Sequence, residues 1–119
     1  MKGISILIFA YNEEKYILQT LKLIYSNIIK TKLNFEIIVL NDGSNDRTKK
    51  KVQFLKKKLK KIKIVNFKKN MGISRSLKYG IKISKYDKLT WFAGDNSYLQ
   101  KNLNKFFKLS EKSDLVNGY

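Results

Sequence analysis

Hydrophobic positions follow two different spacings along this chain. Short apolar runs such as residues 4–9 and 37–40 lack polar alternation, which is typical of strands buried on both faces. Between these runs, apolar residues recur every three or four positions, as at Ile17, Leu21 and Ile24, which predicts helices with one buried face. The pattern predicts strands over residues 3–9, 35–40, 62–67 and 88–92, with a further strand starting at 114–116, and helices over residues 13–29, 44–61, 73–84 and 99–109.

The regular alternation of strands and helices predicts an α/β fold. Short links between the elements favour a mostly parallel sheet with helices on both faces, joined by right-handed crossovers. The chain has no internal repeat and no Pro/Gly/Ser-rich linker, so we expect a single domain over residues 1–119. In open sheets of this kind, ligands bind outside the carboxyl ends of the strands.

Polar turns follow three of the predicted strands, at residues 10–13, 41–46 and 93–97. If the strands are parallel neighbours, four of the nine acidic residues share one edge, which suggests a bound cation that holds an anionic substrate. Alternatively these residues only cap helices, with Asn12 and Ser44 as N-caps and Asp46 in a first turn. The side chains brought to this edge are those of Glu13, Asp42, Asp46 and Asp95, with Asn12, Asn41, Asn45 and Asn96.

Composition narrows the chemistry of such a site. The chain has no Cys and no His, which excludes disulfides, thiolate nucleophiles and zinc sites built from imidazole or thiolate. A protein-bound metal must therefore use oxygen ligands, which favours Mg²⁺, Mn²⁺ or Ca²⁺. Neither a P-loop nor the Gly-x-Gly-x-x-Gly fingerprint is present, so phosphates would be held in another way, and a divalent metal is the simplest one.

The net charge is strongly positive, at +17. Arg47 and Arg75 are the only arginines, and lysine supplies the other positive charges. Arginine is the residue suited to bidentate recognition of bases and phosphates, so nucleic-acid binding is the least favoured interpretation. A solvated lysine surface is preferred, and attraction to an anionic membrane comes second. The first apolar run is too short to span a membrane, so we expect a cytoplasmic location, with peripheral contact at the inner membrane face as an option.

Several motifs occur together in a fixed order. Residues 4–14 form an apolar strand with the turn Ala-Tyr-Asn-Glu, and residues 36–46 with Thr48 read Glu-Ile-Ile-Val-Leu-Asn-Asp-Gly-Ser-Asn-Asp-x-Thr. An Asn-Met-Gly segment follows at residues 70–72, then Gly80, Trp-Phe-Ala-Gly-Asp-Asn at 91–96 and Asp-Leu-Val-Asn-Gly-Tyr at 114–119. In this order and spacing the chain resembles the family 2 glycosyltransferases, which have the GT-A nucleotide-sugar-binding fold.

The resemblance implies a role for each turn. The nucleoside pocket would be lined by Ala10, Tyr11, Asn12 and Glu13, and Asp42, with Asn41, would contact the base or ribose. Asn70 and Gly72 would shape the loop beside the base, near Arg75, and Asp95 would hold Mg²⁺ or Mn²⁺ on the donor diphosphate. Residue types alone favour a helix-capping or loop-bracing role for Asp46 and an exposed helix position for Arg75.

The implied reaction transfers a sugar from a nucleotide-diphosphate sugar to an acceptor hydroxyl, a glycan or a polyprenyl phosphate, as in the synthesis of cell-envelope polysaccharides. Ala93 stands where the family has the first Asp of its Asp-x-Asp motif, and Phe9 replaces a frequent proline. The family continues into an acceptor-binding half that supplies the general base, so we expect the chain to be incomplete and name no base; Glu111 and Asp114 are poor substitutes. The rival hypotheses are an inactive nucleotide-binding fragment and a basic protein that binds membranes or nucleic acids.

Overall fold

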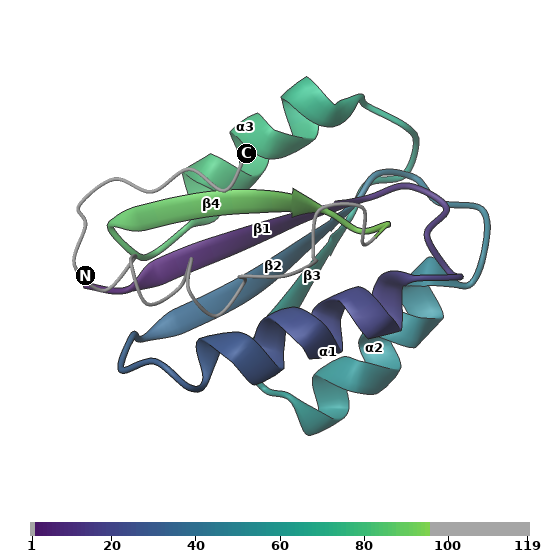
Figure 1. Ribbon diagram of the computed structural model, residues 1–119. Coiled ribbons are helices and arrows are strands. Elements are labelled where there is room, and N and C mark those ends of the chain that lie inside the picture. Colours follow the sequence, from purple (N-terminus) through teal and green to yellow (C-terminus); the bar gives the residue numbers. More distant parts are fainter. Residues whose placement is uncertain (1, 96–119) are drawn as a thin grey trace.

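The computed structural model describes residues 2–95, which form a parallel sheet with three helices (Figure 1). The sheet has four strands in the order β3-β2-β1-β4, and every neighbouring pair is parallel. The expected α/β class, with helices on both faces of the sheet, is confirmed. The elements are β1 (Ile4–Ala10), α1 (Ile17–Ile28), β2 (Phe35–Asn41), α2 (Thr48–Lys58), β3 (Ile62–Asn66), α3 (Ile73–Ile83) and β4 (Lys88–Ala93).

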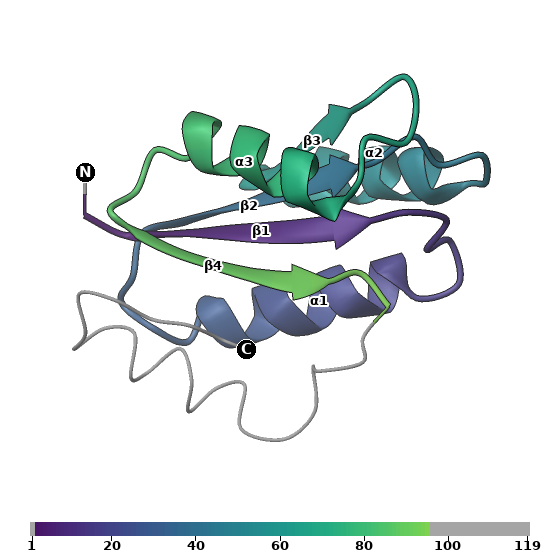
Figure 2. The same ribbon diagram turned by 90° about the horizontal axis from the view of Figure 1, so that it is seen from above.

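Two helices cover one face of the sheet and the third covers the other (Figures 1 and 2). The buried stripe of α1 and residues Val52 and Leu55 of α2 pack on one face, against the alternate strand residues Ile6 and Ile37. On the opposite face, Leu7 packs in a smaller core under α3, where Gly80 lets the helix approach the sheet closely. A Cβ at Gly80 would lie 2.9 Å from the Leu40 side chain and 3.0 Å from that of Leu7.

The strand register brings the carboxyl ends of the strands to one edge. Ala10, the last residue of β1, lies opposite Asn41 of β2, and Asn41 lies opposite Asn66 of β3. On the other side of β1, Phe9 lies opposite Ala93 of β4. The turns that leave β1, β2 and β4 therefore begin side by side (Figure 2).

The first two helices begin later than their periodicity predicts. We expected helix starts at residues 13 and 44, whereas α1 begins at Ile17 and α2 at Thr48. Asn12 is not an N-cap: it has a φ of 52°, and Tyr16 precedes the first turn without a side-chain cap. Ser44 likewise lies four residues before α2, because Asn12 and Ser44 bond across the two turns, Ser44 Oγ accepting the Asn12 N–H, instead of capping helices. The expected helix over 99–109 and strand at 114–116 lie outside the described residues.

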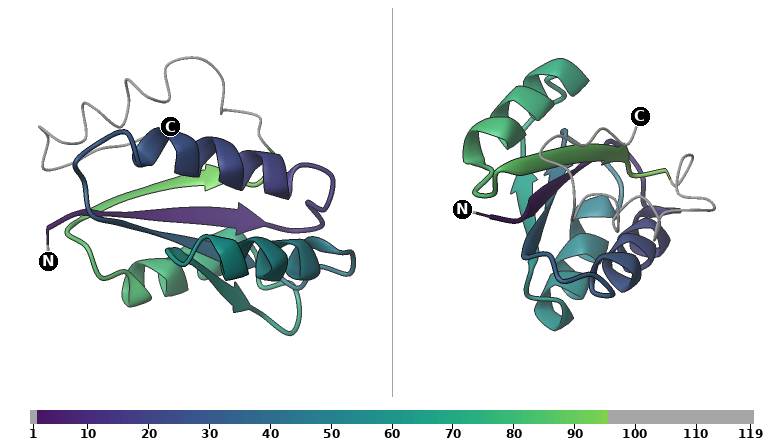
Figure 3. Two further views of the ribbon diagram at one scale, coloured as in Figure 1. Left: turned by 90° about the horizontal axis from the view of Figure 1, so that it is seen from below. Right: turned by 60° about the vertical axis from the view of Figure 1, so that its left-hand side comes forward.

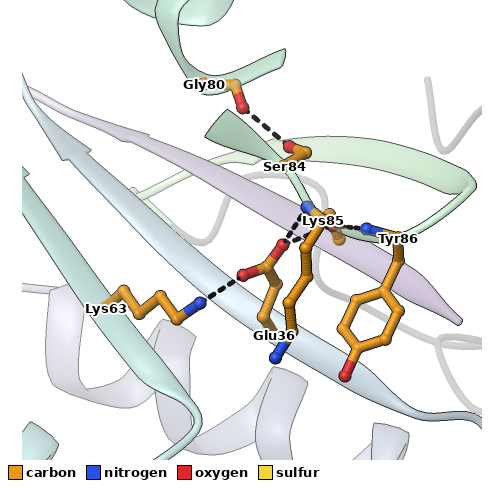
Figure 4. Close-up of polar contacts among 7 residues, drawn as sticks. Glu36, Lys63, Gly80, Ser84, Lys85 and Tyr86 are labelled. Carbon is orange, nitrogen blue, oxygen red and sulfur yellow. Dashed lines mark hydrogen bonds and ion pairs between the residues drawn. The ribbon is translucent and has the colours of Figure 1, made fainter. Parts of the chain in front are cut away.

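At the end of the sheet opposite the carboxyl ends of the strands, a buried carboxylate holds several elements together (Figure 4). Glu36 is 1% exposed and accepts hydrogen bonds from Ser5 Oγ at 2.6 Å, Lys63 Nζ at 2.7 Å and the Lys85 backbone N–H at 2.8 Å. Burial alone would raise the pKa of Glu36, but these hydrogen bonds outweigh it and hold the pKa below its ordinary value. Ser5 Oγ also accepts the Tyr86 N–H, so the link between α3 and β4 is tied to β1 and β2.

None of the helices within residues 2–95 has the length and apolar character needed to cross a bilayer.

Candidate functional site

The turns that follow β1 and β2 are joined by hydrogen bonds between main chain and side chains. Ser44 Oγ accepts the Asn12 N–H at 2.9 Å, and Asn12 Oδ1 accepts the Asn45 N–H at 2.8 Å. Thr48 Oγ1 accepts the Glu13 N–H at 2.9 Å. The positive φ of Asn12, which Asn tolerates better than most residues, turns the chain toward these partners. The residues expected to line a nucleoside pocket thus form a turn held by its neighbour.

Asp46 is the carboxylate that braces this pair of turns. Its Oδ2 accepts the Glu14 N–H at 3.1 Å, and its Oδ1 accepts both the N–H and the hydroxyl of Thr48. Burial alone would raise the pKa of Asp46, but the bonds from Thr48 and Glu14 lower it overall. The loop-bracing role expected for Asp46 is confirmed.

Asp42 faces inward and holds the segment that follows β3. It is fully buried, and its Oδ1 and Oδ2 accept the N–H groups of Met71 at 2.8 Å and Gly72 at 2.9 Å. Gly43 packs against the same segment: a Cβ there would lie 2.5 Å from the Asn70 nitrogen, and its φ of 76° also favours glycine. The structure therefore joins the Asp42 turn to the Asn-Met-Gly segment, as two parts of one edge.

The remaining residues expected at the site differ in exposure. Asn41 is buried, donates to Asn66 Oδ1 at 2.9 Å and accepts the Ser44 hydroxyl at 2.5 Å. Ala10 is also buried, and its carbonyl accepts the Asp42 N–H. Tyr11 is 37% exposed at the start of its turn. Arg75 is an exposed residue of α3, as residue type alone predicts, and Asn70 is exposed as well.

Asp95 and Glu13 approach one another from the turns after β4 and β1. The Gly94 N–H donates to the Phe9 carbonyl at 2.8 Å, and Thr20 Oγ1 donates to the Gly94 carbonyl at 3.0 Å, which fixes this turn over α1. A Cβ at Gly94 would lie 3.4 Å from Cγ of Glu13. Burial raises the pKa of Glu13, and the negative charges of Asp95 and then Asp46 raise it further. Two of the other acids expected at this edge, Asp95 and Asp46, are thus close enough to act on Glu13.

Few protein side chains at this edge could serve as ligands of a divalent cation. Within residues 2–95, no three carboxylates are arranged to hold a metal ion together. Asp95 is exposed and lies beside the half-buried Glu13, so the residues present offer oxygen donors of the kind that Mg²⁺ and Mn²⁺ prefer. With so few protein ligands, the rest of a coordination shell would come from a ligand or from water.

Sequence reasoning gave Thr48 and Glu36 no role. Thr48 is fully buried and holds the main chain of Glu13, and its place in the long β2 motif was the available signal. Glu36 is the only charged residue in a strand that is otherwise apolar apart from its final Asn41, and a buried charge requires partners. That signal was sufficient to predict a paired carboxylate, although not its partners.

Comparison with known proteins agrees with this architecture. The family model described as glycosyl transferase family 2 matches residues 5–118. An uncharacterized glycosyltransferase of Haemophilus influenzae is 36% identical over 110 residues, which cover 83% of this chain and 33% of that protein. The crystal structure of S. aureus TarS 1–349 in complex with UDP is similar with a TM-score of 0.65 and 26% identity, over 80% of this chain and 28% of that one.

A mannosyltransferase from Pyrobaculum calidifontis, solved with GDP-Man and Mn²⁺, has the same fold, with a TM-score of 0.71 over 92% of this chain and 33% of that one, at 16% identity. The fold is therefore that of the GT-A transferases. The chain belongs to glycosyl transferase family 2. It spans about a third of the length of the Haemophilus influenzae relative.

Proposed function

We propose that this domain binds a nucleotide-diphosphate sugar at the carboxyl edge of the sheet, for transfer of the sugar to an acceptor hydroxyl, a glycan or a polyprenyl phosphate. The observation that carries the proposal is the convergence of the turns after β1, β2 and β4 at one edge of the sheet, where the charges of Asp95 and Asp46 both raise the pKa of Glu13. Membership of a transferase family and the UDP in the TarS structure support a nucleotide donor.

The nucleoside would lie against the paired turns after β1 and β2. Tyr11 offers a partly exposed ring, and the Asn12 and Glu13 backbones are fixed by Ser44 and Thr48. Fixed groups bind a ligand with less loss of conformational entropy than mobile ones. Asn70 and Gly72 would border the base, beside Arg75 and against the buried Asn41.

Asp42 has a double role in this proposal. Both of its oxygens already accept N–H groups of the segment after β3, and each carboxylate oxygen carries a second lone pair. Because Asp42 is fully buried, an N–H or O–H group of the nucleoside can donate a hydrogen bond to its carboxylate only after the residues that cover Asp42 move aside. In the absence of such a movement, Asp42 acts on the nucleoside through the position of Met71 and Gly72.

Asp95 would hold Mg²⁺ or Mn²⁺, with Glu13 beside it. When bound, such an ion acts as a Lewis acid that neutralises charge on the diphosphate as it departs. The chain's own residues supply position: Gly94 is fixed by the Phe9 carbonyl and by Thr20, which places Asp95 over the end of β1. A cytoplasmic location, contact at the inner face of the membrane and a role in envelope polysaccharide synthesis are further parts of this proposal.

Calorimetry with UDP and GDP, each with and without Mn²⁺, tests the proposal. We expect one of the nucleotides to bind in a metal-dependent manner, and Asp95→Ala to abolish the metal dependence. Asp87→Asn is the matched control, because Asp87 accepts the Gly3 N–H at the opposite end of the sheet. Absence of binding by both nucleotides, or equal effects of the two variants, would contradict the proposal.

A turnover assay on the same samples separates a transferase from a nucleotide-binding fragment. The alternative is a domain that binds a nucleotide but does not catalyse sugar transfer. Binding without sugar transfer or hydrolysis would support that alternative, and turnover would exclude it.

A further inference from the structure

The outward face of α2 combines dense positive charge with an exposed aromatic ring. Val52 and Leu55 point into the core, so the residues on the opposite side of the helix, Lys50, Phe54 and Lys57, point to solvent. Phe54 is 55% exposed. Lys58 Nζ lies 4.6 Å from the centroid of this ring, so an ammonium group and an aromatic face occupy the same patch.

Within residues 2–95, no salt bridge joins a lysine of α2 to a carboxylate. Residues 47–86, which include all of α2 and α3, contain no Asp or Glu. In the part of the chain that the structure describes, the one salt bridge joins Lys63 to Glu36 and involves no lysine of α2. The lysines of α2 therefore form a cluster of positive charge without a carboxylate on the same helix.

The neighbouring helix α1 extends the patch. A shallow groove between α1 and α2 is lined by Leu18 and Phe54 together with Arg47, Lys50 and Lys51. Figure 3 (right) shows α1 and α2 together on one side of the sheet, away from α3. Leu18 at the start of α1 and Phe54 of α2 are thus bordered by cations in this groove.

We propose that this α1–α2 surface binds an anionic lipid bilayer, with Phe54 in the headgroup region. Lysines close to an anionic membrane are attracted to it, and an exposed aromatic ring is stabilised when it enters the membrane–water interface. A patch with a single arginine does not suit base or phosphate recognition in nucleic acids, which relies on bidentate contacts.

The position of the patch relative to the sheet would bring a bound bilayer close to the candidate site. The turn at residues 42–47 leads directly into α2, so the amino end of the helix lies at the carboxyl edge that holds the candidate site. A bilayer bound along α2 would lie next to that edge, within reach of a lipid-linked acceptor. The binding names the surface for the membrane contact included in the proposed function, and the approach to a lipid-linked acceptor rests on that function.

Cosedimentation of the full chain with vesicles tests the inference. We expect binding to vesicles of phosphatidylcholine with phosphatidylglycerol, little binding to phosphatidylcholine alone, and weakening as salt shortens the Debye length. Equal binding to both kinds of vesicle, or binding to neither, would overturn it.

Two double variants with equal changes of charge locate the surface. Each lysine near an anionic surface contributes about a five-fold factor to binding, so Lys50→Gln with Lys57→Gln should weaken vesicle binding by about twenty-five-fold. The control is Lys78→Gln with Lys82→Gln on α3, where both residues are exposed on the other face of the sheet, and we expect a loss below about three-fold. Phe54→Ser should reduce binding several-fold without any change in charge.

The remaining measurements separate this inference from its rivals. Circular dichroism checks that each variant is folded, and the nucleotide titration with Mn²⁺ should be unaffected by the α2 variants. Equal losses in the α2 and α3 variants would show a response to total charge alone and overturn the inference. Tighter binding to single-stranded RNA than to anionic vesicles, with the same dependence on Lys50 and Lys57, would assign the surface to nucleic acid and also overturn it.

Discussion

Asp42 fixes the position of Gly72, thirty residues further along the chain, through a hydrogen bond of 2.9 Å from the Gly72 N–H to Asp42 Oδ2. The other oxygen of the same carboxylate accepts the Met71 N–H at 2.8 Å. The end of β2 and the segment before α3 therefore behave as one unit, with a buried carboxyl group between them. This relationship makes the candidate base-binding loop sensitive to a residue that is not itself on the surface.

Asp42→Asn should loosen this unit. The amide retains one acceptor, so one of the two backbone N–H groups loses its partner, and we expect a loss of about 1.5–3 kcal/mol in the free energy of unfolding. Urea denaturation measures the loss, and faster hydrogen exchange at Met71 and Gly72 locates it. Glu14→Gln is the control, because the Glu14 side chain makes no hydrogen bond within residues 2–95. Unchanged exchange in the Asp42 variant would show that the two bonds are not needed to hold the loop.

Gly43 and Gly72 form a matched pair for testing how closely the turn after β2 packs against the segment between β3 and α3. Both have positive φ, so an alanine at either position costs about 1–3 kcal/mol in backbone strain. At Gly72 no atom lies within 4 Å of an added Cβ, whereas at Gly43 the backbone of Lys69 and Asn70 lies at 2.5 Å. We therefore expect Gly43→Ala to lower the urea midpoint clearly more than Gly72→Ala does. Equal urea midpoints for the two variants would mean that the turn after β2 does not contact the segment between β3 and α3 in solution.

Glu36 should make the stability of the fold depend on pH. Because its pKa in the folded protein lies below the ordinary 4.5, its stabilising effect is complete above the ordinary value and is lost as pH falls through the folded-state value. Glu36→Gln should cost about 1–3 kcal/mol at pH 7, since a buried charged acceptor is lost. Urea denaturation of both proteins from pH 7 to pH 3 should show the difference shrinking toward the acid end. A difference that stays constant over this range would contradict the assignment.

The pKa of Glu13 reports the position of Asp95. Burial raises it, and the charge of Asp95 is the second cause. Asp95→Asn removes that charge, so the Glu13 carboxyl should titrate at a lower pH, which carbon-13 NMR of the labelled carboxyl can follow. Asp87→Asn, at the far end of the sheet, should leave the titration unchanged. If Asp95→Asn has no effect, the turns after β1 and β4 do not meet as described.

The strands could be predicted from the sequence because burial on both faces leaves a simple apolar run, and all four lie within two residues of the expected positions. The starts of α1 and α2 could not. Asn12 and Ser44 are typical capping residues, but their partners are in each other's turns, more than thirty residues apart. Local sequence does not distinguish these two uses of the same side chain.

The candidate site was predictable in part for the same reason. Parallel strands imply a shared edge, so the meeting of Glu13, Asp46 and Asp95 follows from the order of the elements. The inward orientation of Asp42 does not follow, because it depends on N–H groups presented by a separate segment. The buried pairing of Glu36 was indicated by a charge within an apolar strand, and only its partners needed the three-dimensional arrangement.

The central place of β1 has a consequence for biosynthesis. Its two neighbours are β2, which follows after a short helix, and β4, which begins at Lys88. The half of the edge built from the first two strands can assemble early, whereas the half that carries Asp95 requires closure of a long loop, a slow step. A nascent chain arrested before residue 88 would thus contain the turns after β1 and β2 without the turn that carries Asp95. The full carboxyl edge can form only once β4 has emerged from the ribosome.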